Sequence, residues 1–196
     1  MTLLSGKLEQ FEILLASKSP RREQLLKDAG IKFKIITKDV DESYPEHLRK
    51  EEVVLHLAVK KVEAFSELMN QEKVIVITAD TIVCLGEQII GKPVDFDHAV
   101  KILKSLSGKM HEVFTGVCIS SQKKKELFSV RSEVYFKSLS EDEIYFYLEH
   151  FKPYDKAGAY GIQDWIGLIG IEKINGSYHN VMGLPVKEVY ECLLNF

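Results

Sequence analysis

The sequence has few cysteines and no long apolar run. Its 196 residues include three cysteines, Cys84, Cys118 and Cys192, which lie far apart and form no CxxC pair. This spacing is wrong for a zinc site or a disulfide framework and fits a reducing compartment. No run approaches the ~20 apolar residues of a membrane span, and no apolar segment of signal-peptide length follows a basic N-terminus. We therefore expect a cytoplasmic protein without a membrane span.

The chain also lacks an excess of positive charge and the commonest nucleotide and zinc motifs. Its formal net charge is −3 at pH 7, so no overall basic field would recruit nucleic acid or an anionic membrane. GxxxxGK(S/T), GxGxxG and HExxH are absent. Any phosphate site must therefore be local and of another design. The length and the 45% hydrophobic content predict a single domain over residues 1–196, or two closely joined lobes.

The segment at residues 17–22, SKSPRR, places two arginines at the start of a predicted helix. Ser19 suits the N-cap and Pro20 the first helical position. The first turn of a helix favours acidic side chains, so each basic residue there is unfavourable by roughly 0.3–1 kcal/mol. A bound phosphate would remove this conflict, because helix N–H groups and guanidinium groups both bind its oxygens. The alternative is a solvated arginine pair on an ordinary strand–turn–helix unit.

Apolar periodicity predicts an α/β fold in which strands and helices alternate. The uninterrupted β-branched run at residues 74–78 is typical of a central strand buried on both faces. A capping box of Ser140 and Glu143 begins a helix, and Pro185 begins the C-terminal one. The predicted strands cover about 12–17, 31–37, 74–78, 111–119 and 127–136, and the predicted helices include 20–29, 51–69 and 144–150.

Two charged residues stand out against this pattern. Lys61 falls between Leu57 and Ala58 on the apolar stripe of its helix, so its ammonium either extends out to solvent or reaches into a shared cleft. Asp80 follows the strand at 74–78, where the carboxyl ends of strands in open α/β sheets carry chemistry. Asp80 is therefore a candidate catalytic or metal-binding carboxylate, with a turn or cap as the structural alternative.

Two later segments add polar groups. Lys92, in Gly91-Lys92-Pro93, can project toward the same sheet edge. Residues 154–163 combine two glycines, two alanines and two tyrosines with Lys156 and Gln163. Small residues among aromatic ones allow a backbone to approach a flat ligand closely, although a tight loop fixed by glycines would have the same composition.

Six motifs occur in order along the chain, namely SKSPRR at 17–22, ADT at 79–81, GKP at 91–93, SGKMHEVFTGV at 107–117, DKAGAYGIQ at 155–163 and INGSYHNVMGLP at 174–185. On these motifs, the chain resembles the Maf family of nucleoside triphosphate pyrophosphatases from about residue 13 to the C-terminus. The form DKAGAYGIQ looks like the branch that hydrolyses dTTP and UTP.

The resemblance implies a fold, a reaction and residue roles. The fold is a Maf/ITPase-like α/β one, an elongated mixed β-sheet flanked by helices with a central nucleotide-binding cleft. The reaction is hydrolysis between the α and β phosphates, which gives a monophosphate and pyrophosphate with a divalent metal cation, Mg²⁺ or Mn²⁺. The aspartate of ADT, here Asp80, is the proton acceptor, and Arg21, Thr81 and Gln163 match residues tied to substrate choice. A homodimer is also implied.

The physical roles agree with that resemblance. Glu42, in the loop after the second strand, matches a family glutamate, and with Asp80 it can hold the metal. Gln163 offers a donor and an acceptor to the imide edge of uracil or thymine. Phosphate binding is expected from groups that neutralise or bind its oxygens, namely Ser17, Arg21, Arg22, Lys61, Lys92 and Lys156.

Three functions remain open from the sequence. The leading hypothesis is a dTTP and UTP pyrophosphatase that limits misincorporation into nucleic acids. The first alternative is a 7-methyl-GTP pyrophosphatase, and the second is a nucleotide-binding regulator of septum formation. The carboxylates favour turnover over binding alone, because negative charge weakens phosphate binding. No direct contact with nucleic acid or membrane is expected.

Overall fold

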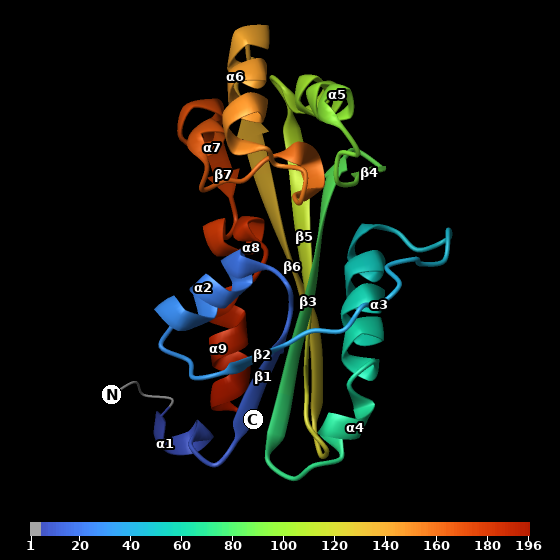
Figure 1. Cartoon of the computed structure of the whole chain (residues 1–196), viewed down its shortest axis with the longest axis vertical. Helices are drawn as coiled ribbons and strands as arrows, with labels where there is room; N and C mark the ends of the chain where they lie inside the picture. Colours follow the sequence, from blue (N-terminus) through green and yellow to red (C-terminus); the bar gives the residue numbers. More distant parts are fainter. Residues whose placement is uncertain (1–4) are drawn as a thin grey trace. The chain divides into compact units, whose positions relative to one another are not determined.

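The computed structural model describes residues 5–196, and over these residues the chain forms a seven-stranded mixed β-sheet flanked by helices (Figure 1). The strand order is β2-β1-β3-β5-β6-β7, and β4 pairs with β3 outside this path. The predicted α/β class is confirmed. Within residues 5–196, no helix is long and apolar enough to cross a membrane.

The chain divides into two compact units. The first contains the described residues up to Asp80, together with Thr115–Val130 and Gly183–Phe196. The second contains Thr81–Phe114 and Arg131–Met182. The long strands β3 (Val74–Leu85), β5 (Met110–Ser120) and β6 (Lys125–Phe136) each contribute residues to both units.

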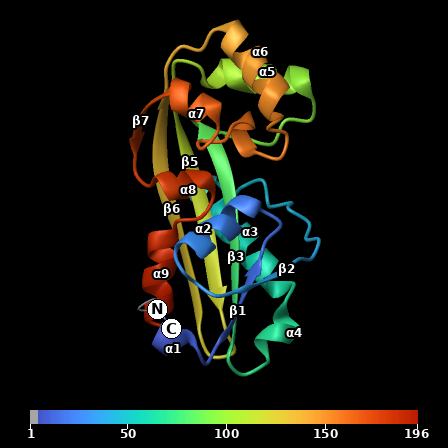
Figure 2. The same ribbon diagram turned by 60° about the vertical axis from the view of Figure 1, so that its left-hand side comes forward.

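The first unit is built on parallel strands. β1 (Glu12–Ala16) pairs in parallel with β3 and with β2 (Lys34–Ile36). Figure 1 draws α3 on one side of β1 and β3 and draws α2 and α9 on the other, and Figure 2 gives the turned view. The helices of this unit are α1 (Ser5–Leu8), α2 (Pro20–Asp28), α3 (Lys50–Glu63), α4 (Ser66–Met69) and α9 (Val186–Leu194).

Helix α3 lies close against the sheet at two points. The Thr78 hydroxyl of β3 donates to the carbonyl oxygen of Ala58, 2.7 Å away. A Cβ on Gly116 of β5 would lie 2.4 Å from the Val54 carbonyl oxygen, so only glycine allows this approach of two backbones. The contacts fix the face that α3 presents to β3.

The second unit packs its helices around a hydrophobic core with several aromatic rings. The antiparallel partners β4 (Gln88–Ile90) and β7 (Ile171–Asn175) pair with β3 and β6. Tyr147, Phe136 and Tyr160 are among the core side chains. The helical segments are α5 (Phe96–Leu106), α6 (Glu141–Phe151), the 3-10 turn η1 (Ala157–Ala159), α7 (Trp165–Gly170) and α8 (Tyr178–Met182).

Two sequence predictions of secondary structure are wrong. The strand predicted at 74–78 continues through Asp80 to Leu85, because its second half pairs with β4 across a turn in which Gly86 has φ +57°. The helix predicted at 51–69 is two helices, since Phe65 leaves helical geometry at φ −114° and ψ 23° while it packs on the core. Helices α7 and α8 were not predicted.

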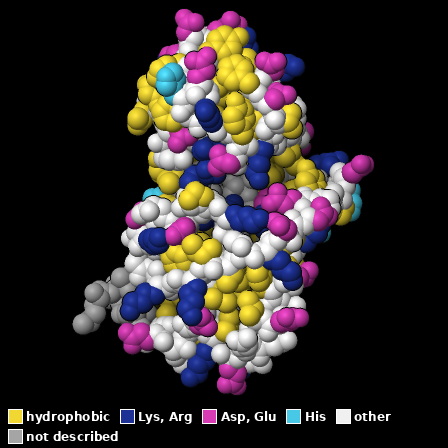
Figure 3. Space-filling view, in the orientation of Figure 1, with side chains coloured by type: hydrophobic (Ala, Val, Ile, Leu, Met, Phe, Trp, Pro, Cys, Tyr) yellow, Lys and Arg dark blue, Asp and Glu magenta, His cyan; other side chains and the backbone are white. Residues whose placement is uncertain are grey.

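Surface charges are mixed. On the face drawn in Figure 3, Lys and Arg side chains are interspersed with Asp and Glu. That face has no continuous basic field of the kind that would bind a nucleic-acid backbone.

Candidate active site

Lys61 brings together the two carboxylates proposed as metal ligands. Its Nζ lies 2.8 Å from Oε1 of Glu42 and also contacts Oδ1 of Asp80. The Lys61 side chain is 16% exposed and that of Asp80 is 12% exposed. The lysine that sequence reasoning placed on an apolar stripe is therefore an ion-pair partner for carboxylates and does not extend out to solvent.

The position of Asp80 follows from the pairing of β3 with α3. Thr78 and Asp80 are two residues apart in a strand, so their side chains leave the same face. Ala58 and Lys61 are three residues apart in a helix and also share a face. Thr78 contacts Ala58 while Asp80 contacts Lys61, so one register sets both contacts. Asp80 consequently projects from the middle of a buried strand and not from its end.

Arg22 ties the start of α2 to two distant backbone segments. Its Nε donates to the Gly183 carbonyl at 2.7 Å, and one Nη donates to the Ala79 carbonyl at 2.8 Å. Burial lowers the pKa of Arg22, while the negative charge of Asp80 opposes that shift. Nearby Arg21 lowers the same pKa further. These contacts hold the α2 N-terminus beside the residue that precedes Asp80.

The first turn of α2 is not capped in the usual way. Ser19 occupies the N-cap position, yet within the described chain its hydroxyl caps none of the N–H groups of α2. Ser17 instead shapes the turn, because its Oγ accepts a hydrogen bond from the Ser19 N–H at 3.1 Å. Arg21 lies in this first turn and is partly exposed. A helix start with no side-chain cap and an arginine suits an anionic ligand.

The loop that carries Glu42 is attached to α3 by a neighbouring lysine. Lys60 Nζ contacts Asp41 Oδ2 and the Ser43 carbonyl oxygen, each at 2.9 Å. Hydrogen bonds from Ser43 and then Lys60 lower the pKa of Asp41 to about 2. Glu42 lies between these two attached residues. Sequence reasoning missed this attachment, although the adjacent lysines of α3 and the acidic loop were both visible.

In the second unit, Gln163 and Lys156 meet at Asp164. Gln163 Nε2 donates to Asp164 Oδ1 at 3.1 Å. Lys156 Nζ lies 2.8 Å from Asp155 Oδ1 and 3.9 Å from Asp164 Oδ2. Asp164 was not predicted, because nothing in its sequence neighbourhood indicates which side chains it contacts.

Lys92 and Thr81 lie in the same unit as Gln163. Lys92 is exposed in the loop after β4, and the Gly91 carbonyl beside it accepts from the Gly158 N–H at 3.2 Å. Thr81 directly follows Asp80 in β3 and is partly buried. The roles assigned to all the site residues remain predictions, namely those of Ser17, Arg21, Arg22, Glu42, Lys61, Asp80, Thr81, Lys92, Lys156 and Gln163.

The donor set around Lys61 fits a divalent cation that is shared with a substrate. Mg²⁺ is usually held by one or two carboxylates together with substrate phosphates and water. Glu42 and Asp80 supply two carboxylates that already converge on one cationic atom. Among residues 5–196, no group of three or more His, Cys, Asp and Glu could hold a metal alone. The two carboxylates that are present fit a metal that shares its coordination with substrate phosphates.

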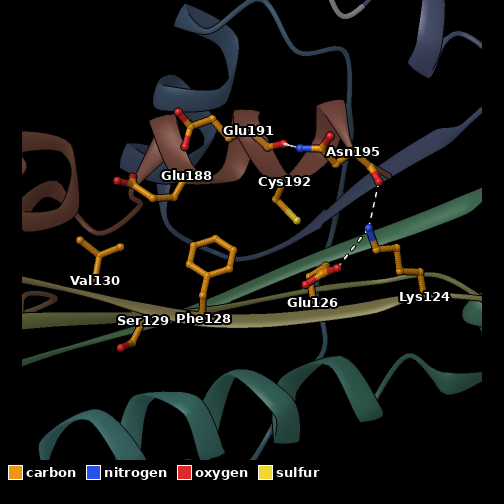
Figure 4. A pocket seen from close by; sticks show the side chains of 9 residues that line it. All are labelled: Lys124, Glu126, Phe128, Ser129, Val130, Glu188, Glu191, Cys192 and Asn195. Carbon is orange, nitrogen blue, oxygen red and sulfur yellow. Dashed lines mark hydrogen bonds and ion pairs between the residues drawn. The ribbon is translucent and has the colours of Figure 1, made fainter.

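A pocket elsewhere in the first unit lies between β6 and α9 (Figure 4). Phe128 and Cys192 line it, and Lys124 contacts the Asn195 carbonyl oxygen at its edge at 2.9 Å. None of the candidate residues lines this pocket, so it is separate from the predicted site.

The chain is an α/β protein with a candidate polyphosphate site in its first unit and a candidate loop for a flat ligand in its second. Residues 12–196 match the family model described as Maf-like protein, and the chain belongs to the Maf family. The family prediction made from the six motifs is confirmed.

Several curated relatives cover nearly the whole chain, and three of them are each named dTTP/UTP pyrophosphatase. The protein of Christiangramia forsetii is 50% identical over 191 residues, 97% of this chain and 97% of the relative. That of Porphyromonas gingivalis is 48% identical over 191 residues, 96% of each chain. That of Bacteroides fragilis is 46% identical over 187 residues, 95% of this chain and 96% of the relative.

Among solved structures, the Staphylococcus aureus Ham1 protein matches with a TM-score of 0.43 and 16% identity. The match covers 64% of this chain and 71% of that one.

Proposed function

We propose that this protein is a nucleoside triphosphate pyrophosphatase that hydrolyses dTTP and UTP to the monophosphate and pyrophosphate. The observation that carries the proposal is the convergence of Glu42 and Asp80 on Lys61. Relatives at 46–50% identity over almost the full chain bear the name of this activity. The GIQ sequence that favours the same branch ends at Gln163, the residue held by Asp164.

In the proposed reaction, water attacks the α phosphorus, the bond to the bridging oxygen of the β phosphate breaks, and pyrophosphate leaves. Asp80 orients the attacking water and accepts its proton. Arg21 and the uncapped N–H groups of α2 bind phosphate oxygens. Arg22 holds α2 in place through its two carbonyl contacts.

The divalent cation would be held by Glu42 and Asp80. When bound, it supplies Lewis-acid polarisation of phosphate oxygens and of water. Lys61 keeps both carboxylates in one place, because its ammonium offsets their mutual repulsion. Mg²⁺ or Mn²⁺ suits these oxygen donors.

We also propose that the enzyme is cytoplasmic and homodimeric and has one functional domain. Its activity would limit the incorporation of wrong or modified pyrimidine nucleotides into nucleic acids. The family resemblance supports these properties, and the three separated cysteines support the cytoplasmic location alone.

The test is pyrophosphate release from dTTP, UTP, CTP, ATP, GTP and 7-methyl-GTP, with Mg²⁺ or with EDTA, for the wild type and Asp80→Asn. We expect metal-dependent turnover of dTTP and UTP that falls by about 10²–10⁴-fold in the variant, because the proton acceptor is lost. An Asp80→Asn protein with near-normal turnover would contradict the role of Asp80. Turnover of 7-methyl-GTP alone would contradict the pyrimidine assignment, and no turnover at all would favour the regulatory alternative.

A further inference from the structure

The amide of Gln163 has a polarity set by Asp164. Its Nε2 donates to Asp164 Oδ1 at 3.1 Å. An ionised carboxylate accepts hydrogen bonds and donates none, so the NH₂ end of the amide must face Asp164 and the oxygen must face away. Reversing the amide would place two acceptors against each other.

The amide oxygen of Gln163 is buried and has no partner within residues 5–196. Buried acceptors in folded proteins are nearly always paired, and an unpaired one is unfavourable. An acceptor fixed in this way matches a ligand that presents an N–H group. This observation is independent of the contact with Asp164, since it concerns the opposite end of the amide.

The other carboxylate oxygen of Asp164 is held by a hydrogen bond from Tyr147. Tyr147 lies on α6 with no exposed surface, and its hydroxyl is 2.7 Å from Asp164 Oδ2. The Gly161 N–H donates to the same hydroxyl oxygen at 3.0 Å. An ionised carboxylate only accepts, so the Tyr147 hydroxyl donates its proton to Asp164 while its oxygen accepts from Gly161. Both carboxylate oxygens of Asp164 are therefore in defined hydrogen bonds.

The backbone closes one side of this pair. A Cβ built on Gly161 would lie 2.5 Å from Asp164 Oδ2 and 2.8 Å from Gln163 Nε2. Glycine at this position lets the loop pass directly against the two side chains. Their arrangement is thus held by the loop and by α6.

We infer that Asp164 is a positioning residue for base selection. By orienting Gln163, it makes the amide an acceptor for the imide N3–H of uracil and thymine and rejects cytosine, whose N3 is also an acceptor. A free amide could turn to suit either base, whereas one held by a carboxylate cannot. The inference rests on the proposed function, because it assigns the base subsite of that reaction.

The first experiment compares kcat/KM for UTP and CTP in the wild type and in Asp164→Asn. The asparagine keeps the shape of the side chain, but it can accept or donate, so Gln163 becomes able to turn over. We expect the wild type to prefer UTP. In the variant, the ratio of kcat/KM for UTP to that for CTP should fall about tenfold, which corresponds to the loss of one net hydrogen bond. The change should fall on the ratio of the two substrates, which a general loss of stability would not alter.

Asp155→Asn is the matched control. Asp155 also pairs with Lys156, at 2.8 Å, and it precedes that lysine in the chain, whereas Asp164 follows Gln163. This variant should keep the UTP to CTP ratio of the wild type. A ratio that falls equally in both variants would overturn the inference in favour of a general charge effect.

A second measurement uses only the wild type, so it holds even where Asp164→Asn does not fold. N3-methyl-UTP lacks the imide proton, and 5-methyl-UTP keeps it while carrying the same added methyl group. We expect kcat/KM to fall for N3-methyl-UTP and to stay near the value for UTP with 5-methyl-UTP. Equal turnover of N3-methyl-UTP and UTP, or an unchanged ratio in a folded Asp164→Asn protein, overturns the inference. Failure of the proposed function is distinct, because the wild type would then hydrolyse neither UTP nor dTTP.

Discussion

The Lys61 cluster of the first unit and the Asp164 network of the second unit use a carboxylate in opposite ways. Around Lys61, an ammonium from a helix joins Glu42 of a loop and Asp80 of a strand by charge. Around Asp164, the main partners are a phenol and an amide, with an ammonium only at 3.9 Å. The Lys61 cluster brings charged side chains together, and the Asp164 network orients neutral ones.

This difference matches what each region would have to recognise. A triphosphate with a metal ion offers charge with little directional detail, so ion pairs suffice to hold the groups that bind it. A pyrimidine base is neutral and is distinguished by the direction of its donors and acceptors. Substitutions that remove a charge from the Lys61 cluster should therefore lower the rate for all substrates. Substitutions that change the hydrogen-bond directions in the Asp164 network should instead change which substrate is preferred.

Apart from Asp80→Asn, Lys61→Met should produce the largest effect. The substitution leaves Asp80 and Glu42 without their shared cation, and kcat/KM should fall by about 10²–10³-fold for UTP and dTTP alike. Steady-state kinetics at saturating Mg²⁺ would measure the loss. An equal loss of kcat/KM for UTP and dTTP would show that the Lys61 cluster acts through charge and not through base recognition. Near wild-type activity of Lys61→Met would show that Lys61 has no role in the mechanism.

The stability of the second unit should fall on acidification because of His111. His111 is fully buried, its Nε2 is 2.7 Å from the Tyr160 hydroxyl, and burial lowers its pKa from 6.5 to about 4. Between these values the unfolded chain binds a proton that the folded chain does not, so stability falls as the pH is lowered from 6.5 to 4. The free energy of unfolding should lose about 3 kcal/mol over this range from His111 alone.

Urea unfolding of the wild type and of His111→Gln across pH 4–6.5 would check this expectation. Glutamine does not titrate, so the variant should lose less stability on acidification. His47→Gln, in an exposed loop, serves as the control and should follow the wild type. Parallel pH curves for wild type and His111→Gln would show that His111 does not contribute.

The smallest expected effect comes from Lys60→Met. Lys60 attaches the loop of Glu42 through exposed contacts to Asp41 and Ser43. Exposed ion pairs are weak, so the Mg²⁺ concentration for half-maximal activity should rise by about two- to fivefold. Titration of activity with Mg²⁺ would measure the change, with Lys101→Met on the exposed face of α5 as the control. An unchanged metal requirement would mean that the loop keeps Glu42 in place by itself.

The residues of the Lys61 cluster and of the α2 start were largely predictable from the sequence, because each of them departs from the usual residue preferences of helices or strands. Two arginines at a helix start, a lysine on an apolar stripe and an aspartate after a β-branched run each conflict with ordinary patterns. The partner of Lys61 was not predictable, since it depends on the register between β3 and α3. The length of β3 was also missed, because Asp80 interrupts the apolar run and only the pairing with β4 continues the strand.

The Asp164 network was much less predictable from the sequence. The GIQ segment singled out Gln163, but Asp164 has a role only through Tyr147, which lies on another element 17 residues earlier. Hydrogen bonds of this kind depend on where a loop passes, and loop paths have no periodicity. Helices α7 and α8 were missed for a related reason, since both are shorter than the segments in which helical periodicity is visible.

The contacts of Arg22 also have a consequence for biosynthesis. The guanidinium of Arg22 donates to the carbonyl of Gly183, which lies 161 residues later along the chain. Because a ribosome makes the chain from its N-terminus, this hydrogen bond cannot form until Gly183 has been synthesised. The candidate anion-binding start of α2 therefore gains this contact only after α3 to α8 have been made.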